Sequence, residues 1–383
     1  MKRIVRREEQ LAAAPELRDP SFSDAVITWQ KKYGRHSLPW QQTRDAYRVW
    51  LSEIMLQQTQ VTAVIPYYQR FLQRCPSIFD LAQASNEEVM ALWSGLGYYT
   101  RARNLHRCAK QVVEQYQGRF PSDPALLQEL PGIGRSTAAA IAAFSYGTQA
   151  AILDGNVKRV FARVFGVEGY PGAKAVEDQL WVRAQALLPE KDIESYTQGL
   201  MDLGATLCTR SSPSCQRCPL QSKCVAFRDH RTAELPQKKP KTKVKEKHAL
   251  MFLLRHGDQV LLEQRPESGI WGGLLSLPEY QGMQVSADED ALNEPQMRTA
   301  AETFAKPYGE IKELHTLPAL THVFTHFRLQ FQVMYVVIDR PVLSVQEQGM
   351  TWLSLADSQQ AALPAPIKTL LLQLAAQLSP VAN

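Results

Sequence analysis

The sequence has no run of eighteen or more apolar residues, so we expect no membrane span. Residues 1–20 are rich in charge and lack the apolar core of a secretory signal peptide. Cysteine is also scarce, with six in 383 residues, and a secreted disulfide framework would distribute such residues along the chain. These absences predict a protein of the cytoplasm or another reducing compartment.

The chain is too long for one typical domain, and its length suggests two or three. With 45% hydrophobic and 21% charged residues, the composition is that of a soluble globular protein. A net charge of +5 raises the expectation of a nucleic-acid partner only modestly, because many basic proteins bind none.

Residues 21–207 form the first predicted domain, and their apolar periodicity predicts mainly helix. Tyr47–Ile65 carries apolar residues at helical intervals before Pro66, and Thr137–Tyr146 is alanine-rich and follows a glycine-containing turn. Short segments rich in glycine and proline separate these helices.

The pattern changes near residue 230. Segment 231–247 contains six lysines between Lys238 and Lys247 and is predicted to be a basic linker, which either is a plain tether or also touches phosphates. Beyond it, alternation of period two predicts strands, and helical spacing returns near the end. The predicted strands are 248–254, 259–263 and 324–338, and the predicted helix is 366–376. Residues 248–383 are therefore predicted to form an α+β domain.

Four of the six cysteines lie together in segment 208–230, with the spacing C-x6-C-x2-C-x5-C. They are Cys208, Cys215, Cys218 and Cys224. Four thiolates can hold either zinc or an iron–sulfur cluster, and the single C-x2-C pair favours the cluster because zinc ribbons usually have two. A cluster alone would also suit an electron carrier. Cys75 and Cys108 stand apart and are interpreted as buried thiols.

A second motif joins two helical segments at Leu130–Thr137. Gly132 and Gly134 permit a backbone that admits a phosphate to the amide groups and to the N-terminus of the next helix. About twenty residues later, Asp154 follows an apolar stretch and precedes another helix. Taken alone, the turn could be a plain helix–helix connection and the aspartate a helix cap.

In this order and spacing, the turn, the L-D-G-N-V segment at 153–157 and the cysteine loop resemble the helix-hairpin-helix glycosylase superfamily, which includes endonuclease III. Segments 51–61 and 95–105 are similar to the adenine DNA glycosylases of that superfamily, the MutY family. The resemblance implies a mainly α helix-hairpin-helix glycosylase domain with an iron–sulfur loop, and one [4Fe–4S] cluster per chain held by the four cysteines.

The resemblance also implies catalytic roles. Glu53 would protonate N7 of the extruded adenine and then help to activate water, and Asp154 would stabilise the positive sugar. Asn156 would help to order the site. Because relatives with strand-cleaving activity carry a lysine where this chain has Ser136, we expect hydrolysis without a strong lyase step.

Several residues are implied to contact DNA. Gln58 and Tyr98 match positions that wedge into the duplex beside the extruded base, which offsets the cost of unstacking. The remaining predicted DNA contacts are in the phosphate-binding turn: Gly132, Gly134, Ser136 and Thr137.

The C-terminal domain resembles a Nudix (MutT-like) fold at Arg265–Pro278, but the R-E-x-x-E-E metal motif of Nudix hydrolases does not follow. In the adenine glycosylases this domain reads 8-oxoguanine with a Phe-Ser-His loop, which corresponds here to Phe324, Thr325 and His326. Threonine keeps the hydroxyl and adds a methyl group.

These features predict an enzyme that excises adenine opposite 8-oxoguanine or guanine in double-stranded DNA, as a cytoplasmic, nucleoid-associated monomer. A bifunctional pyrimidine-specific relative would explain the first domain but not Ser136 or the C-terminal domain. A non-catalytic DNA-binding or electron-transfer protein would not explain Glu53 and Asp154 together.

Overall fold

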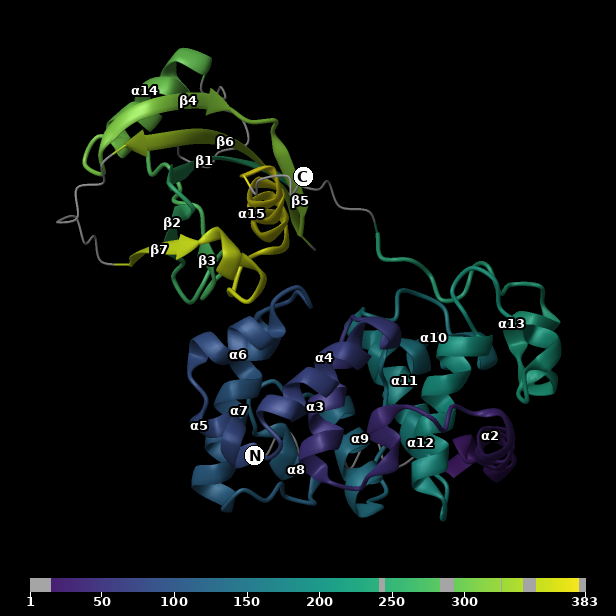
Figure 1. Cartoon of the computed structure of the whole chain (residues 1–383). Helices are drawn as coiled ribbons and strands as arrows, with labels where there is room; N and C mark the ends of the chain where they lie inside the picture. Colours follow the sequence, from purple (N-terminus) through teal and green to yellow (C-terminus); the bar gives the residue numbers. More distant parts are fainter. Residues whose placement is uncertain (1–14, 241–244, 283–292, 325, 340–348, 379–383) are drawn as a thin grey trace, which may run out of the picture. The chain divides into compact units, whose positions relative to one another are not determined.

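The computed structural model describes residues 15–240, 245–282, 293–324, 326–339 and 349–378. The chain divides into two compact units, which Figure 1 shows in sequence colours. The first unit comprises 1–83 and 104–241, and the second comprises 84–103 and 242–383. Segment 84–103, which lies within the predicted helical domain, therefore clusters with the C-terminal residues.

The first unit is built from helices, as the sequence predicts. Its principal elements are α2 (Pro20–Tyr33), α3 (Ala46–Leu56), α4 (Val61–Arg74), α5 (Ile78–Gln83), α7 (Thr100–Tyr116, which begins in the second unit), α8 (Pro124–Gln128), α9 (Arg135–Tyr146), α10 (Gly155–Val164), α11 (Lys174–Ala186), α12 (Ile193–Asp202) and α13 (Val225–Arg228). Within the part of the chain that the structure describes, we find no helix long and apolar enough to cross a membrane.

The core of this unit forms around α9, which lies among α3, α8 and α12 (Figure 1). The six residues Ala138–Ala143 of α9 are all buried, and their small side chains let neighbouring helices approach closely. Phe22, Phe161 and Tyr196 fill the space beside them. Cys75 and Cys108 are buried thiols, as predicted.

One predicted helix is corrected by the structure. The expected helix over 47–65 is two helices, α3 and α4, because the chain turns at Gln58, where φ is +59°. Pro66 lies inside α4 and does not end it. Its missing N–H removes a single hydrogen bond near the helix start, and the apolar face of α4 (Val64, Tyr68, Phe71) stays buried.

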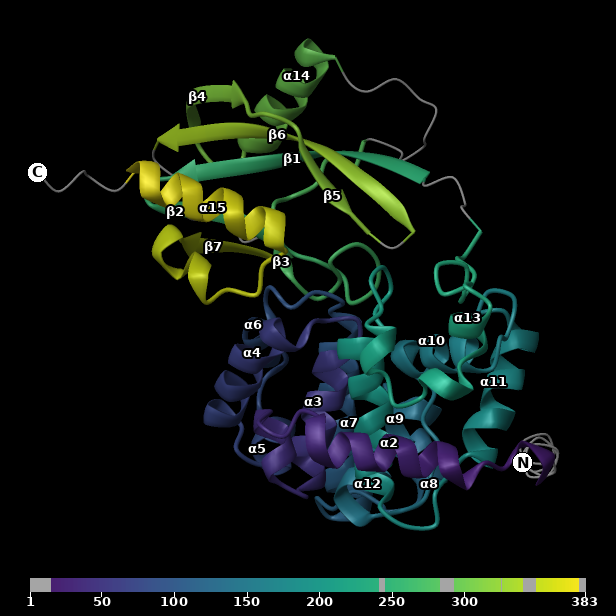
Figure 2. The same ribbon diagram turned by 90° about the vertical axis from the view of Figure 1, so that its right-hand side faces the viewer.

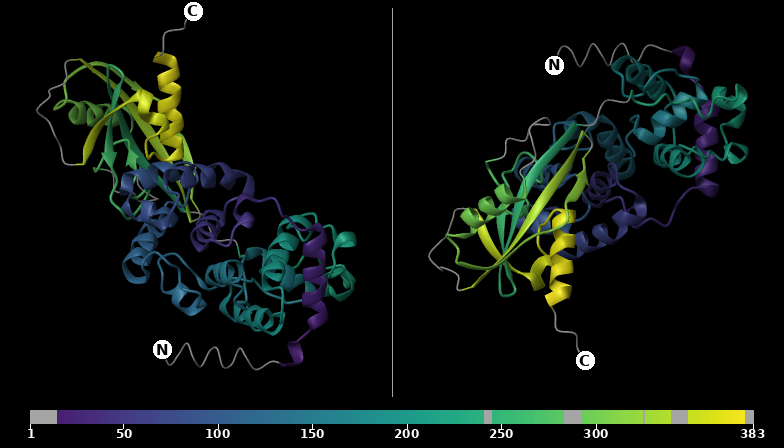
Figure 3. Two further views of the ribbon diagram at one scale, coloured as in Figure 1. Left: turned by 60° about the horizontal axis from the view of Figure 1, so that its bottom comes forward. Right: turned by 90° about the horizontal axis from the view of Figure 1, so that it is seen from above.

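The second unit contains one seven-stranded mixed sheet, which confirms the α+β prediction. Its strands are β1 (Lys245–His256), β2 (Gln259–Gln264), β3 (Leu275–Ser276), β4 (Glu310–Thr316), β5 (Leu320–Val323), β6 (Phe327–Asp339) and β7 (Met350–Ser354), in the order β3-β2-β1-β6-β4, with β5 paired to β6 and β7 to β2. The long strands β1 and β6 run parallel side by side (Figure 3).

Helix α14 (Glu294–Ala305) packs on this sheet (Figure 2). The other helices of the unit are α6 (Asn86–Trp93) and α15 (Ala365–Leu378). The predicted strand 324–338 begins only at Phe327, because β5 pairs antiparallel with β6 and the intervening residues connect this hairpin. Thr325 lies outside the described residues.

Candidate active site

Glu53 lies near the C-terminal end of α3, on a helix whose neighbouring side chains Trp50, Ile54 and Met55 are buried. These apolar residues hold the helix in place, while Glu53 itself is partly buried and lines a cavity. Burial, together with the nearby charge of Asp154, raises the pKa of Glu53 to about 8. A raised pKa favours the protonated form of this carboxyl group, which is the form that a general acid requires.

Asp154 is the N-cap of α10, since its carboxylate accepts a hydrogen bond from the backbone N–H of Val157 at 2.9 Å. Asn156 Nδ2 donates to the other carboxylate oxygen at 3.1 Å. Burial raises the pKa of Asp154, and the hydrogen bonds from Val157 and Asn156 oppose this rise. Asp154 therefore caps helix α10 and also lies near Glu53. The fold thus brings the two predicted carboxyl groups together.

The hydroxyl of Ser136 accepts a hydrogen bond from the backbone N–H of Leu153 at 2.9 Å. Leu153 directly precedes Asp154 and is buried. Ser136, which we predicted to contact DNA, is therefore hydrogen-bonded to the residue that precedes Asp154. Since Ser136 occupies the place of a lysine in the strand-cleaving relatives, this position carries no amine.

The predicted phosphate-binding turn precedes α9. Gly132 has φ of +78°, and a Cβ there would lie 2.9 Å from Asn104 Cβ, so glycine is required. Gly134 is the N-cap of α9, and no described side chain caps the amide groups that follow it. Thr137 Oγ1 accepts from Gln57 Nε2 at 3.4 Å, which links the turn to the end of α3.

Gln58 and Tyr98 lie in different units. Gln58 is exposed between α3 and α4 in the first unit, and Tyr98 is exposed in the second, where φ is +49°. Positive φ also occurs at four other non-glycine residues of the described chain, so this backbone conformation does not by itself assign a function to Gln58 or Tyr98.

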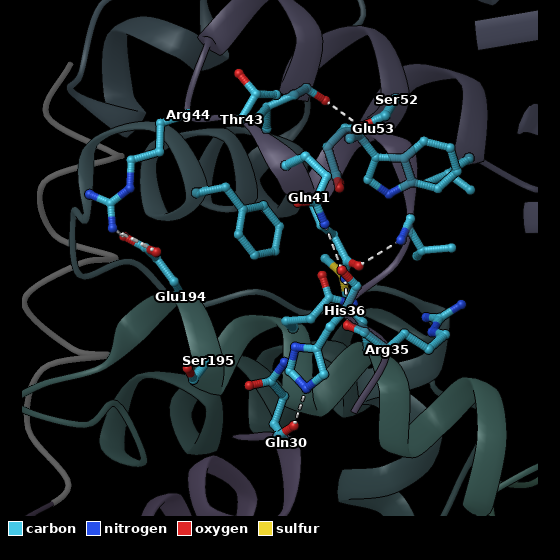
Figure 4. Close-up of a pocket in the computed structure, with 18 of the residues that line it drawn as sticks. Gln30, Arg35, His36, Gln41, Thr43, Arg44, Ser52, Glu53, Glu194 and Ser195 are labelled. Carbon is cyan, nitrogen blue, oxygen red and sulfur yellow. Dashed lines mark hydrogen bonds and ion pairs between the residues drawn. The ribbon is translucent and has the colours of Figure 1, made fainter. Parts of the chain in front are cut away.

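A cavity of about 620 Å³ opens beside Glu53 in the first unit. Figure 4 shows Glu53 together with residues of the loop between α2 and α3 and of α12. Arg44 pairs with Glu194 at 2.7 Å, and a ring nitrogen of His36 lies 3.0 Å from the Gln30 carbonyl oxygen. Sequence reasoning did not single out these wall residues, since they become neighbours only when α2 and α12 pack together.

A second group that the sequence did not single out centres on Arg159. Its Nε donates to the carbonyl of Cys208 at 2.7 Å, and its Nη2 donates to Asn156 Oδ1 at 2.8 Å and to the Gly204 carbonyl at 2.7 Å. A continuous series of hydrogen bonds thus runs from the cysteine loop through Arg159 and Asn156 to Asp154. The only sequence feature that could have indicated Arg159 is its position about one turn after Asp154, in the helix that Asp154 caps.

The four predicted cysteines line one cavity, together with Arg163, Leu203 and Leu207. Arg163 is buried, and its Nη1 lies 3.4 Å from Cys208 Sγ and 2.7 Å from the Thr209 carbonyl. Nowhere in the described ranges are three His, Cys, Asp or Glu side chains gathered closely enough to hold a single metal ion. Four thiols around a shared space, with a guanidinium donating to one, are a donor set that fits a cluster larger than one ion.

In the second unit, a cavity of about 420 Å³ is lined by two predicted groups, Tyr98 on one side and Phe324 and His326 on the other. The Phe324 ring stacks on Phe327 at 4.4 Å and meets His322 edge-on at 4.6 Å. The glutamates of helix α14 are Glu294 and Glu302, so this helix does not carry the R-E-x-x-E-E pattern.

Comparison with known proteins identifies both parts of the chain. Residues 51–186 match the HhH-GPD superfamily base excision DNA repair proteins, and residues 249–373 match the NUDIX domain. The adenine DNA glycosylase of Buchnera aphidicola subsp. Schizaphis graminum is 35% identical, over 91% of this chain and 97% of the relative.

The Homo sapiens adenine DNA glycosylase is 32% identical over 91% of this chain and 73% of the relative. Among solved structures, a thermostable thymine-DNA glycosylase matches with a TM-score of 0.50 and 30% identity, over 54% of this chain and 95% of that one. The chain belongs to the adenine DNA glycosylase family, which combines a helix-hairpin-helix base excision repair domain with a Nudix-like domain.

Proposed function

We propose that this protein hydrolyses the N-glycosidic bond of adenine paired with 8-oxoguanine or guanine in double-stranded DNA, as a monofunctional glycosylase. The observation that carries the proposal is the proximity of Glu53, whose pKa is raised by burial and by Asp154, to the hydrogen-bonded carboxyl group of Asp154 in the first unit. Cleavage of a glycosidic bond needs such an acid and such an anion.

The two groups have complementary tasks. Glu53 donates its proton to N7 of the extruded adenine, so that the base leaves as a neutral molecule. The sugar then carries positive charge, which the carboxylate of Asp154 stabilises. The bonds from Asn156 Nδ2 and the Val157 amide favour the ionised form of Asp154 and fix its direction. Glu53, now ionised, accepts a proton from the water that attacks the sugar.

Strand cleavage would need an amine to attack the sugar, and Ser136 offers none. Its hydroxyl is committed to the Leu153 amide. Hydrolysis without a lyase step follows from this replacement.

The cysteine loop would hold one [4Fe–4S] cluster per chain through Cys208, Cys215, Cys218 and Cys224. When bound, the cluster supplies a fixed, structured loop. Two arginines of the chain hold this loop. Arg163 donates a hydrogen bond to the Thr209 carbonyl, and Arg159 connects the Cys208 carbonyl to Asn156.

We assign DNA contacts to Gln58, Tyr98 and the turn of Gly132, Gly134, Ser136 and Thr137, and recognition of the lesion to Phe324, Thr325 and His326. The cavity shared by Tyr98, Phe324 and His326 supports the last assignment. We further propose that the protein acts as a monomer, in the cytoplasm at the nucleoid.

Single-turnover cleavage of duplexes that hold adenine opposite 8-oxoguanine, guanine or cytosine tests the function. We expect release of adenine from the first two, and loss of at least about a hundredfold in rate for Glu53→Gln, since that is the smaller end of general acid catalysis. Full activity in Glu53→Gln would overturn the mechanism. Efficient nicking of abasic DNA with stoichiometric borohydride trapping would instead favour a bifunctional enzyme.

A further inference from the structure

Arg101, in the first turn of α7, is a buried guanidinium that the mechanism above does not use. Its Nη2 atom donates to the carbonyl of Leu96 at 3.3 Å and to the carbonyl of Gly97 at 3.1 Å. The same group lies over the ring of Trp93 at 5.2 Å and over the ring of Tyr98 at 5.5 Å. These contacts replace part of the water that the charge loses on burial, so they fix the position of the guanidinium.

The two carbonyl acceptors belong to the turn between α6 and α7 that presents Tyr98. Gly95, Gly97 and Tyr98 have φ of +96°, +75° and +49°. Left-handed backbone at a residue other than glycine persists only where neighbouring contacts hold it. The Gly97 carbonyl has a second donor, Trp93 Nε1, at 3.0 Å, and the Tyr98 carbonyl accepts from the backbone N–H of Arg101 at 2.8 Å. The turn is thus held from inside, while the Tyr98 side chain remains 49% exposed.

An exposed aromatic side chain enters a duplex more readily when its direction is already fixed. A freely rotating ring loses conformational entropy on insertion, and this loss opposes the extrusion of the base. Arg101 limits that freedom in two ways, because it clamps the backbone on the N-terminal side of Tyr98 and attracts one face of the ring.

We propose that Arg101 is a positioning residue for base extrusion, which clamps the Leu96 and Gly97 carbonyls and holds Tyr98 in the direction that lets it enter the duplex. The inference rests on the proposed function, and on the assignment of Tyr98 as a wedge. Arg101 makes no contact with DNA in this proposal, because its side chain is buried, and it acts only through Tyr98.

The test is a double-mutant cycle on single-turnover excision of adenine opposite 8-oxoguanine, with Arg101→Met and Tyr98→Ala made separately and together. Arg101→Met alone should lower the rate about tenfold, the value of about one hydrogen bond. In the Tyr98→Ala background the same change should lower it by less than about twofold, since the wedge that it positions is already gone. Equal losses in the two backgrounds would show a merely structural role and overturn the proposal.

A second readout separates extrusion from bond cleavage. 2-Aminopurine in place of the adenine becomes more fluorescent when it leaves the base stack, and the Glu53→Gln background keeps it attached to the sugar. We expect Arg101→Met and Tyr98→Ala to reduce the fluorescence increase on binding by the same fraction. A full increase in Arg101→Met would contradict a role in extrusion.

Trp93→Phe is a second variant, which removes the N–H donor to the Gly97 carbonyl and keeps an aromatic ring beside Arg101. It should also lower the excision rate, and Tyr98→Ala should abolish this effect. If Arg101→Met does not fold, Trp93→Phe decides the question. An unchanged rate, or a loss that persists in the Tyr98→Ala background, then overturns the proposal.

Arg255→Met is the matched control, since Arg255 lies over the ring of Tyr335 at 5.8 Å and donates to the Gly257 carbonyl in the same unit. It should leave the excision rate and the fluorescence increase unchanged. A wild-type protein that releases no adenine would contradict the proposed function. A wild type that releases adenine, with losses from Arg101→Met and Tyr98→Ala that simply multiply, contradicts only the role of Arg101.

Discussion

At the scale of single residues, two carboxyl groups of nearly equal intrinsic acidity acquire different tasks from their surroundings. Glu53 is placed among apolar side chains of α3, which raises its pKa to about 8. Asp154 is also buried, but a backbone amide and the Asn156 amide donate to it and offset part of that cost. Burial raises both pKa values, and only Asp154 has hydrogen-bond donors that favour its ionised form and oppose the rise.

The protonation of Glu53 predicts a pH dependence of the excision rate. Because the general acid must carry its proton, the single-turnover rate should fall as the pH rises through about 8. A rate profile from pH 6 to 9.5 measures this. A rate that stays level up to pH 9.5 would contradict the assignment of Glu53 as the acid.

Folding stability should depend on the same group. The pKa of Glu53 is about 8 in the folded protein and 4.5 when it is unperturbed, so the folded state binds more protons between these values. The unfolding free energy should therefore decrease as the pH rises from about 4.5 to about 8. Glu53→Gln should remove this component, and thermal unfolding of both proteins across that range provides the comparison.

We expect Ser136 to contribute to folding stability and to the excision rate, in addition to replacing a lysine. Ser136→Ala would leave the buried Leu153 amide without its partner, which costs about 1–3 kcal/mol of unfolding free energy. It should also slow excision, because Leu153 fixes the start of the Asp154 segment. Urea denaturation and single-turnover rates measure the two effects, and Ser122→Ala, on an exposed loop, is the control.

At the scale of elements, the start of α10 is held by the segment that leads to the cysteines. Residues Leu203–Leu207 continue α12 as a π-helical turn, and Gly204 in this turn packs against Asn156. Arg159 adds hydrogen bonds to both. The cysteine loop and the carboxylate of Asp154 are thereby parts of one packed arrangement, although 54 positions separate Asp154 from Cys208 in the sequence.

Gly204→Ala tests this arrangement. The added Cβ would lie 2.4 Å from Asn156 Cβ and 2.9 Å from its Cα, so the backbone at the start of α10 must shift. Since a displacement of about 1 Å can cost a hundredfold in rate, we expect a loss of about that size in single-turnover excision. Iron content should remain at the wild-type level, and an unchanged excision rate would show that Asn156 does not need this contact.

At the scale of the whole molecule, the two units carry different parts of the proposed task. The first holds the carboxyl pair, the phosphate-binding turn and the cysteines, and the second holds the cavity shared by Tyr98, Phe324 and His326. Chemistry and recognition of the opposite base should therefore respond to separate substitutions.

His326→Ala should lower the preference for 8-oxoguanine over guanine about tenfold, with little change in the rate on adenine opposite guanine. The measurement is the ratio of single-turnover rates on the two duplexes. His315→Ala, which removes an exposed histidine from β4, is the control. An unchanged preference in His326→Ala would remove this residue from lesion recognition.

Much of this protein could be predicted from the sequence, where the signal is local. Apolar periodicity predicted α9 and α15, and alternation predicted β1 and β2. Cysteine spacing predicted a metal centre, and the four thiols do line one cavity. The sequence did not reveal the break between α3 and α4, because the left-handed residue there is Gln58 and not a glycine, which would have signalled a turn. Pro66 was expected to end the helix, but it lies in the early part of α4, where a helix can accommodate proline.

The sequence by itself determined the family, the two fold classes and the identity of Glu53, Asp154 and the four cysteines as candidates, since these depend on residue types at fixed spacings. Only the tertiary structure decided that burial raises the pKa of Glu53, that Ser136 faces Leu153, and that Arg159 connects the Cys208 carbonyl to Asn156. The reason is physical: burial, and hydrogen bonds between residues distant in sequence, exist only once α2, α3, α10 and α12 have packed together.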